Sequence, residues 1–221
     1  MFKILAVLLA VCTASVCEAA DVYSASKLQP VAASVEVNPF VGAYGGLTVG
    51  GQFTDITVGD NDREIFSGIS ADGYNLGGIV GYNFAYRNIV FGPYAEYGVS
   101  DVSVSVLGND VLTMDDYAQL GAMVGVNVSK NTLVSVHIAR EWDTWSAGNT
   151  DVDVAGWVFG GAIDTMVASQ VSVGLVLDYV AFDSVEVDGG ADLSGFLEDS
   201  DALRAKVRLL YRPRFELPKL Y

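Results

Sequence analysis

Residues 156–181 read GWVFGGAIDTMVASQVSVGLVLDYVA, and this stretch indicates the fold. Large apolar residues alternate with small or polar ones from Trp157 to Tyr179, interrupted by a turn near Ser169-Gln170. A period of two predicts β-strands. The face opposite the large apolar residues carries glycine and aspartate and almost no Lys or Glu. Such a pattern is typical of a strand with lipid on one side and a narrow polar lumen on the other.

The composition leaves two structural classes open. Hydrophobic residues make up 51% of the 221 residues, and the mean hydropathy is +0.36. Past residue 20, no apolar run approaches the roughly 18–20 residues that a transmembrane helix needs. The chain is therefore either a well-buried soluble β protein or a membrane barrel. Its 24 glycines and 11% aromatic residues suit a barrel with tight packing inside and aromatic girdles outside.

Residues 1–20 are predicted to form a secretory signal peptide. Lys3 gives a positive start and residues 4–11 an apolar core, which is too short for a retained anchor helix. A lipoprotein is the alternative, but Val precedes both Cys12 and Cys17, where a lipobox requires a small residue. Because both cysteines fall inside the signal, the mature chain would contain no disulfide and no Cys-ligated metal site.

The rest of the chain divides into a predicted periplasmic leader at 21–37, an outer-membrane β-barrel domain at 38–215 and a periplasmic C-terminal tail at 216–221. The barrel domain contains eight segments with strand-like alternation. They lie at about 39–53, 73–86, 88–99, 116–128, 132–142, 154–167, 171–182 and 202–212.

The connections between these segments alternate in length. Three are short turns, at 86–88, 129–131 and 168–170. Four are expected to be long loops, at about 54–72, 100–115, 143–153 and 183–201. Together they predict an all-β fold, an eight-stranded antiparallel up-and-down transmembrane β-barrel with both termini on the periplasmic, short-turn side. A soluble eight-stranded barrel of the lipocalin kind is the alternative, although lipocalins carry charge on their outer faces.

The large apolar side chains are expected to face lipid. Aromatic residues near the strand ends are expected to form interfacial belts. They are Tyr82, Phe84, Tyr86, Phe91, Tyr97, Trp142, Trp157, Tyr179 and Tyr211. Arg140 shares this outward parity, so we place it near the outer rim, where its guanidinium would meet lipid phosphates.

Charge is distributed unevenly along the chain. The net charge is −15, and 18 of the 27 acidic residues fall in the four long connections, where Arg63 is the only basic residue. Six of the 12 basic residues lie between Arg204 and Lys219. An acidic rim excludes nucleic acid as a partner, because a phosphate backbone would be repelled. It suits divalent cations shared with lipopolysaccharide, or a cationic host surface. The simpler alternative is a set of solvated loops that only keeps the surface hydrophilic.

Parity also predicts a cluster of charges inside the barrel. Unpaired charges in a narrow lumen are costly, whereas opposite charges can pair. The predicted lumen cluster consists of Glu96, Glu141, Asp164, Asp178, Arg204, Lys206, Arg208 and Arg212. Asp178 is expected to be the direct partner of the last strand, because the seventh and eighth segments should be neighbours. We interpret the cluster as structural rather than as an ion-conducting gate.

Five stretches resemble one known family. They are NPFVGAYGGLTVG (38–50), GYNLGGIVGYNF (73–84), GWVFGGAID (156–164), LVLDYVAFD (175–183) and LRAKVRLLYR (203–212). In this order they resemble the small eight-stranded outer-membrane β-barrels of Gram-negative bacteria, the OmpA-like and opacity-type group, and within it the porin-family or hemin-binding branch. The resemblance implies location in the cell outer membrane after secretion to the periplasm, and assembly by the barrel assembly machinery.

The chain departs from this family in two places. The family usually carries Glu where Asp164 and Asp178 stand. It also usually ends in an aromatic residue directly after the last strand, whereas Pro213 follows the last strand here and should end regular pairing. Tyr211, Phe215 and Tyr221 are the candidates for the terminal aromatic assembly signal.

Three functions are compatible with these observations. The first is a non-enzymatic barrel that supports envelope integrity and displays acidic loops to cations, lipopolysaccharide, a host surface or heme, with no cofactor, metal or catalytic residue of its own. The second is a narrow, porin-like solute channel. The third is a lipid A-modifying enzyme using Ser135, His137 and Glu141, but their order and inward parity do not match that class. His137 is the only histidine, and its inward parity is unsuited to capturing heme at the surface.

Overall fold

The computed structural model describes residues 38–60, 63–106, 109–147, 150–187 and 201–213. The signal, the leader and the tail predicted from the sequence lie outside these residues. Nine strands are present in the described part: β1 (Gly42–Asp60), β2 (Arg63–Tyr86), β3 (Ile89–Ser100), β4 (Ser103–Val106), β5 (Asn109–Ser129), β6 (Thr132–Ala147), β7 (Thr150–Ala168), β8 (Val171–Val187) and β9 (Asp201–Tyr211). No helix in the described ranges is long and apolar enough to cross a membrane.

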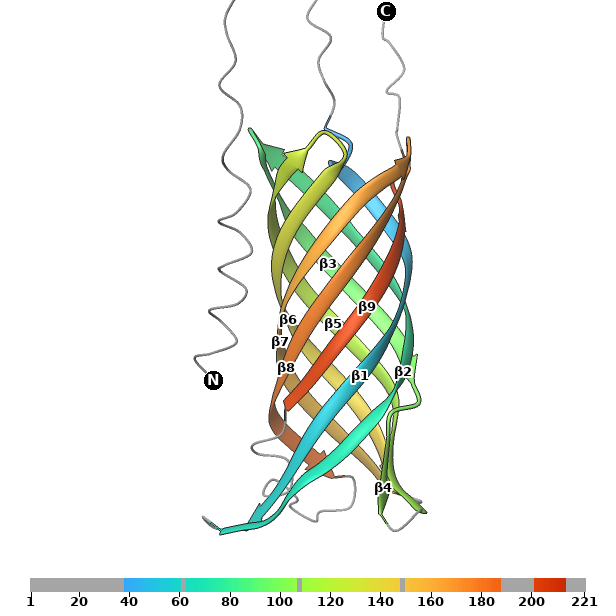
Figure 1. The fold of residues 1–221 in the computed structure, drawn as a ribbon, viewed down its shortest axis with the longest axis vertical. Coiled ribbons are helices and arrows are strands. Elements are labelled where there is room, and N and C mark those ends of the chain that lie inside the picture. The colour runs from blue at the N-terminus through green and yellow to red at the C-terminus, as the bar shows by residue number, and fades with distance from the viewer. Residues whose placement is uncertain (1–37, 61–62, 107–108, 148–149, 188–200, 214–221) are drawn as a thin grey trace, which may run out of the picture. The chain divides into compact units, whose positions relative to one another are not determined.

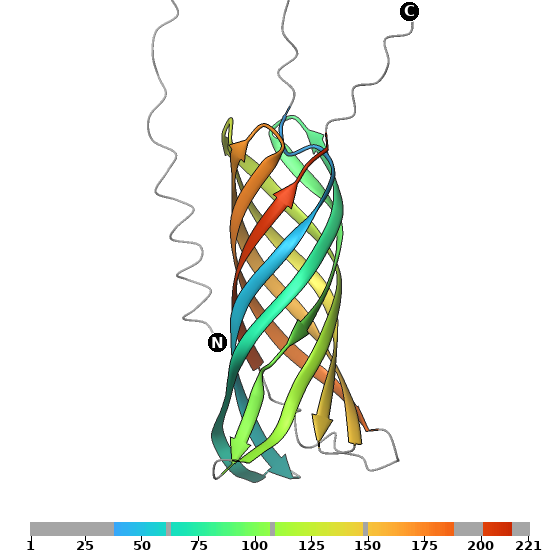
Figure 2. The same cartoon turned by 90° about the vertical axis from the view of Figure 1, so that its right-hand side faces the viewer.

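The strands close into an antiparallel barrel (Figures 1 and 2). Each strand pairs with its neighbour in sequence, except that β3 and β4 each pair with β2 and β5 and not with each other. β1 pairs with both β2 and β9, which closes the sheet. β3 and β4 occupy one strand position of the barrel, since both pair with β5 and are separated only by Asp101 and Val102. The side chain of Val102 turns inward and is fully buried, so the break is a local kink in the wall. The predicted eight-stranded up-and-down barrel is confirmed.

The connections confirm one part of the prediction and correct another. β2 ends at Tyr86 and β3 begins at Ile89, and the other two short turns also fall where they were expected. The long loops were wrong at three of four places. β1–β2, β4–β5 and β6–β7 continue as paired hairpins as far as the pairs Asp60–Arg63, Val106–Asn109 and Ala147–Thr150. The regular alternation of large apolar and small residues fades in the sequence of these segments, which made them resemble loops. They retain β-branched residues, and antiparallel hairpin pairing needs no lipid contact.

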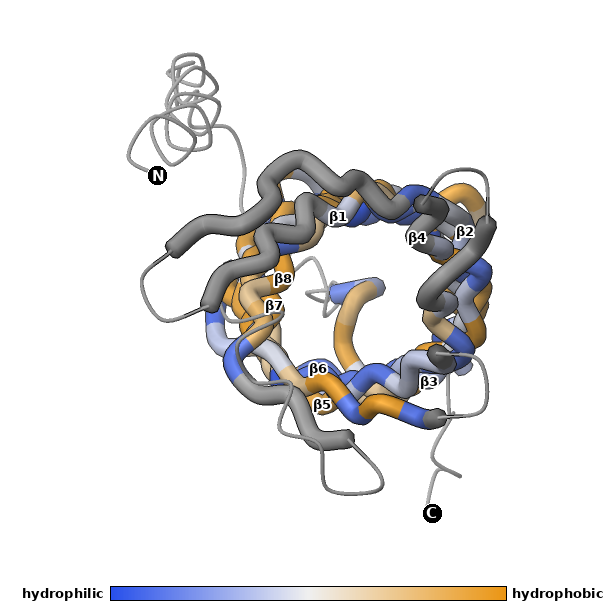
Figure 3. The backbone as a smooth tube through the Cα atoms, turned by 90° about the horizontal axis from the view of Figure 1, so that it is seen from below, coloured by the Kyte–Doolittle hydropathy of each residue, from blue (hydrophilic) through white to orange (hydrophobic). Residues whose placement is uncertain are grey.

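The two faces of the wall differ sharply. Outward side chains form an apolar band, which runs from Trp157 to Val167 on β7 and from Leu203 to Tyr211 on β9. All nine aromatic residues expected at the belts are exposed in this band. Inward side chains are mostly buried and include polar and charged groups. Figure 3, which looks along the barrel from its lower end, shows the strands as a ring around this interior.

The short-turn end is closed by packing. Phe40 precedes β1 and is fully buried, and its carbonyl oxygen accepts hydrogen bonds from Asn83 Nδ2 (3.1 Å) and Arg212 Nη1 (3.2 Å). It belongs to a small apolar cluster with Val90, Met123 and Leu133. The chain thus turns inward before β1 begins and fills the barrel at this end.

Candidate functional site

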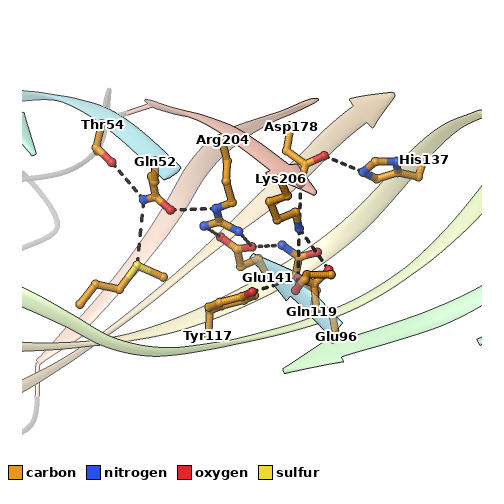
Figure 4. A network of polar contacts seen from close by, with 12 residues as sticks. Gln52, Thr54, Glu96, Tyr117, Gln119, His137, Glu141, Asp178, Arg204 and Lys206 are labelled. Carbon is orange, nitrogen blue, oxygen red and sulfur yellow. Dashed lines mark hydrogen bonds and ion pairs between the residues drawn. The ribbon is translucent and has the colours of Figure 1, made fainter. Parts of the chain in front are cut away.

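All eight residues of the predicted lumen cluster lie inside the barrel. Three of the four cations come from β9, and Arg212 directly follows it. The carboxylates come from β3, β6, β7 and β8. Seven of the eight residues are buried, and Arg208 is partly buried. Figure 4 shows how β9 reaches its partners at the middle of the lumen.

Arg204 and Glu141 form a two-bond pair across the lumen. Arg204 Nη1 and Nη2 donate to Glu141 Oε2 and Oε1 at 2.8 and 3.0 Å, and both side chains are completely buried. Arg204 Nε also donates to Gln52 Oε1 at 2.8 Å, and Gln119 Nε2 donates to Glu141. A planar guanidinium that donates and a planar carboxylate that accepts therefore connect β9 to β6, with amides from β1 and β5 completing the contacts.

Lys206 is shared between two carboxylates. Its Nζ lies 3.1 Å from Glu96 Oε2 and 3.0 Å from Asp178 Oδ2. Asp178 also contacts His137 Nε2 at 2.8 Å. The ammonium therefore joins β3 and β8 through β9, and a single cation balances two buried anions.

Asp178 is a partner of β9, as expected, but its cation is not the residue directly opposite. Arg204 lies beside Asp178 in the strand register, yet it bonds Glu141 instead. Inward side chains meet across the barrel axis, so adjacency within the wall does not decide the pairing.

Arg208 and Asp164 form a third ion pair. Arg208 Nε donates to Asp164 Oδ1 at 2.8 Å, and Nη2 donates to the second carboxylate oxygen. This two-bond contact joins β9 to β7. The shorter Asp side chain, which departs from the Glu typical of the resembled family, still reaches the arginine.

Arg212 is held differently from the other three cations. Its guanidinium carbon lies 4.8 Å from the ring centroid of Tyr44 and 5.3 Å from that of Phe40. Within the described residues its printed contacts are these rings, the carbonyl of Phe40 and the hydroxyl of Ser172, and none is a carboxylate. Aromatic faces and neutral oxygens thus stabilise this charge.

Inward glycines leave room for the charged groups. A Cβ atom at Gly160 would collide with Asp178 Oδ1 and His137 Nε2. A Cβ at Gly174 would collide with Asp164 Oδ1. The inward glycines of the β7–β8 hairpin therefore make room for the charged side chains that form the ion pairs.

Several members of the interior network were missed at the sequence level. Thr48 Oγ1 and Tyr117 Oη donate to Glu96 at 2.8 and 2.9 Å, and Gln52 and Gln119 contact the Arg204 pair. Their inward parity was the available signal. Asp143, assigned to a loop, is a buried inward residue of β6, because that strand continues to Ala147.

The residues of the enzyme alternative are not brought together. His137 bonds Asp178, and Glu141 bonds Arg204. Ser135 Oγ has no hydrogen-bond partner in the described part of the chain. A serine nucleophile needs a base within hydrogen-bond reach, so this arrangement lacks the contact on which activation depends.

Polar pairs mark the outer face where the apolar band ends toward the long hairpins. Arg140 donates two hydrogen bonds to Asp183 and lies 5.5 Å from the Trp157 ring centroid. Tyrosine hydroxyls donate to Asp116 and Asp201 at 2.9 and 2.7 Å. Among the side chains that the structure describes at this end, the exposed or partly exposed carboxylates are Asp72, Asp101, Asp115, Asp116, Asp151, Asp153, Asp183 and Asp201. Arg140 faces outward near the rim as predicted, and its partner here is a carboxylate.

No family model and no curated protein matches the sequence. Solved structures to which the chain is similar include the attachment invasion locus protein Ail of Yersinia pestis, at 10% identity over 77% of this chain and 98% of that chain, with a TM-score of 0.41. Neisserial surface protein A is 11% identical over 78% and 99%, with a TM-score of 0.48. The outer membrane protein OprG of Pseudomonas aeruginosa is 13% identical over 77% and 95%, with a TM-score of 0.39. The barrel assignment for this chain rests on its own strand pairing.

Proposed function

We propose that this protein is a non-enzymatic barrel of the bacterial outer membrane, which supports the envelope and displays acidic hairpins at the cell surface. The supporting observation is the distribution of side chains across the wall. Leu175 is 64% exposed on the outer face, whereas Arg204 and Glu141 are 0% exposed inside. A soluble barrel would place these residues the other way round. Outward strips of about ten residues match the roughly 9–11 residues of a membrane-spanning strand.

The filled interior favours a closed barrel over a solute channel. The Arg204–Glu141 pair, Lys206 with its two carboxylates and the Phe40 cluster occupy successive levels of the lumen. An eight-stranded barrel is only wide enough for its own side chains. We therefore assign the cluster a structural role, in which it holds the wall strands together from inside.

The exposed aspartates support a surface role for the end of the barrel that carries the β1–β2, β4–β5 and β6–β7 hairpins, which we call the long-hairpin end. They lie just beyond the apolar band, at the level where lipid headgroups begin. Carboxylates there are suited to divalent cations, which also bind the phosphates of lipopolysaccharide. Heme capture by His137 has little support, because this histidine is enclosed and bonded to Asp178.

Membrane insertion is tested by folding the protein into lipid vesicles and running it on SDS gels with and without heating. We expect an unheated form that resists SDS and migrates differently from the heated one. Planar bilayers containing the same protein should show no sustained conductance. A protein that stays in aqueous buffer without a heat shift would contradict the membrane assignment, and steady openings would contradict the closed barrel.

Orientation is tested with single cysteines in a chain whose Cys12 and Cys17 are replaced by alanine. Asp153→Cys lies at the long-hairpin end and Lys130→Cys at a short turn. In intact Gram-negative cells, a membrane-impermeant maleimide should label the first variant and leave the second unlabelled until the cells are opened. The reverse labelling would overturn the proposed orientation.

A further inference from the structure

A small cavity lies beside the ion pairs in the middle of the lumen. Its volume is about 10 Å³ for the centre of a water molecule, which is the room that a single water needs. Its lining includes Thr48, Tyr94, Glu96, Val176, Lys206 and Arg208. Glu96 and Lys206 appear together at this level of the lumen in Figure 4. The cavity is therefore small, enclosed and largely polar.

The hydroxyl of Tyr94 has no partner within the protein. Tyr94 points inward from β3 and is 6% exposed. Its Oη is buried and makes no hydrogen bond to any residue that the structure describes. Tyr117, by contrast, donates directly to Glu96 at 2.9 Å. Buried polar groups almost always have a partner, either from the protein or from ordered water. The orphaned hydroxyl thus indicates a ligand in the cavity that Tyr94 lines.

Three other groups around the cavity have hydrogen-bonding capacity beyond their contacts in the protein. Thr48 Oγ1 donates to Glu96 at 2.8 Å, so its oxygen can still accept. Glu96 Oε2 accepts from Lys206 at 3.1 Å and has a second lone pair. Arg208 bonds Asp164 through Nε and Nη2, which leaves Nη1 outside that pair. With Tyr94, the cavity offers two donors and two acceptors.

The charges around the cavity favour a neutral ligand. Lys206 lies between Glu96 and Asp178, and Arg208 is bonded to Asp164. A further cation would be repelled by the ammonium of Lys206, and an anion would meet the carboxylate of Glu96. A molecule with no charge, two donors and two acceptors matches this lining.

We propose that the cavity binds one water molecule, which accepts a hydrogen bond from Tyr94 Oη and donates one to Glu96 Oε2. Arg208 Nη1 is the second donor to this water, and Thr48 Oγ1 is its second acceptor. Internal waters with two to four such partners are a fixed part of protein structures. The water connects β1, β3 and β9 inside the barrel. The site does not depend on the proposed surface role.

A crystal structure of the full-length protein in detergent, at a resolution that shows ordered waters, tests the site directly. We expect one density peak in the cavity, about 2.5–3.0 Å from Tyr94 Oη and from Glu96 Oε2. Crystals soaked in rubidium bromide should show no anomalous peak there, because the ligand is neutral. An empty cavity, a rubidium or bromide peak, or a Tyr94 hydroxyl bonded directly to a protein atom would each overturn the proposal.

Val176→Ile provides a matched variant, because its added methyl group enters the cavity that Val176 lines. Magnetic relaxation dispersion of water counts long-lived internal waters in solution, and the count should fall by about one in this variant. Val173→Ile, on the outer face of the same strand, is the control and should leave the count unchanged. An unchanged count in Val176→Ile that retains the SDS heat shift would overturn the site. If this variant does not fold, the density in the unaltered protein decides.

Discussion

The middle of the lumen and its short-turn end each hold buried cations, from β9 and from Arg212 directly after it, and stabilise them in different ways. In the middle, Lys206 and Arg204 meet carboxylates from strands on other sides of the barrel. At the short-turn end, Arg212 lies between the rings of Phe40 and Tyr44. Charge pairs therefore hold the middle of the barrel, and packing closes its end. The energetic consequences of removing the cation should differ, because loss of Lys206 leaves buried carboxylates behind, whereas loss of Arg212 leaves two aromatic rings.

Lys206→Met should give the largest effect. The substitution keeps the volume roughly similar and leaves Glu96 and Asp178 buried without their cation, so the free energy of unfolding should fall by about 3–5 kcal/mol. Urea unfolding in lipid vesicles measures it. Lys130→Met, at an exposed turn, is the control and should change the value by about 0.5 kcal/mol or less. Equal stability of the two variants would show that the middle of the lumen does not depend on this cation.

Gly160→Ala tests whether the middle of the lumen has room to spare. The new Cβ would collide with the Asp178–His137 pair, so we expect a loss of about 1–3 kcal/mol from overpacking. Gly78→Ala is the matched control on β2, where the nearest atom to the new Cβ is 3.9 Å away. Its unfolding free energy should stay within about 0.5 kcal/mol of the unaltered protein. A neutral Gly160→Ala would mean that the ion pairs shift easily.

Arg212→Met tests the short-turn end of the lumen, for comparison with the two variants in its middle. It removes the contacts with two rings and one hydrogen bond to the Phe40 carbonyl, but it leaves no carboxylate exposed to a dry interior. The expected loss is about 1–2 kcal/mol, smaller than for Lys206→Met. Combining it with Tyr44→Leu in a double-mutant cycle isolates the aromatic contact. A larger loss than that of Lys206→Met would contradict the view that the middle of the lumen depends on buried charge more than its short-turn end does.

Arg140→Ala should give the smallest effect. Its pair with Asp183 lies on the outer face and is partly exposed, so we expect a loss of no more than about 1 kcal/mol. High salt should reduce the difference further, because solvent-exposed charges are screened. Unfolding in low and high salt checks both statements. A salt-independent loss would indicate that packing against Trp157 matters more than the charge.

The sequence was sufficient to predict which side chains of the barrel wall point inward and which point outward. It was insufficient to predict which inward side chains contact one another. Two-residue alternation predicted which way Asp164, Asp178 and the basic residues of the last strand point. It did not predict that Arg204 would bond Glu141, because that choice depends on how strands are staggered across the barrel axis. Stagger is a property of the closed sheet and leaves no local pattern in the chain.

The hairpin ends were misjudged for a related reason. Beyond the apolar band, outward positions become polar, so the contrast that marks a membrane strand disappears while the backbone remains paired. Asp143 illustrates the error, since it was assigned to a loop and lies buried on a strand. The inward polar residues Thr48 and Gln119 lie at inward positions of the alternation, but they carry no charge, so the search for a charge cluster did not include them.

The four cations of the lumen cluster lie on β9 or directly after it, and β9 is the last of the described strands to leave the ribosome. The anions that it balances are made earlier, on β3, β6, β7 and β8. Closing the seam between β1 and β9 therefore also brings these cations to the buried carboxylates. A chain truncated before residue 201 would form an open sheet with several carboxylates that have no cation to pair with, and it could not close into a barrel. Closure of the wall and pairing of the interior charges therefore both depend on β9 being present.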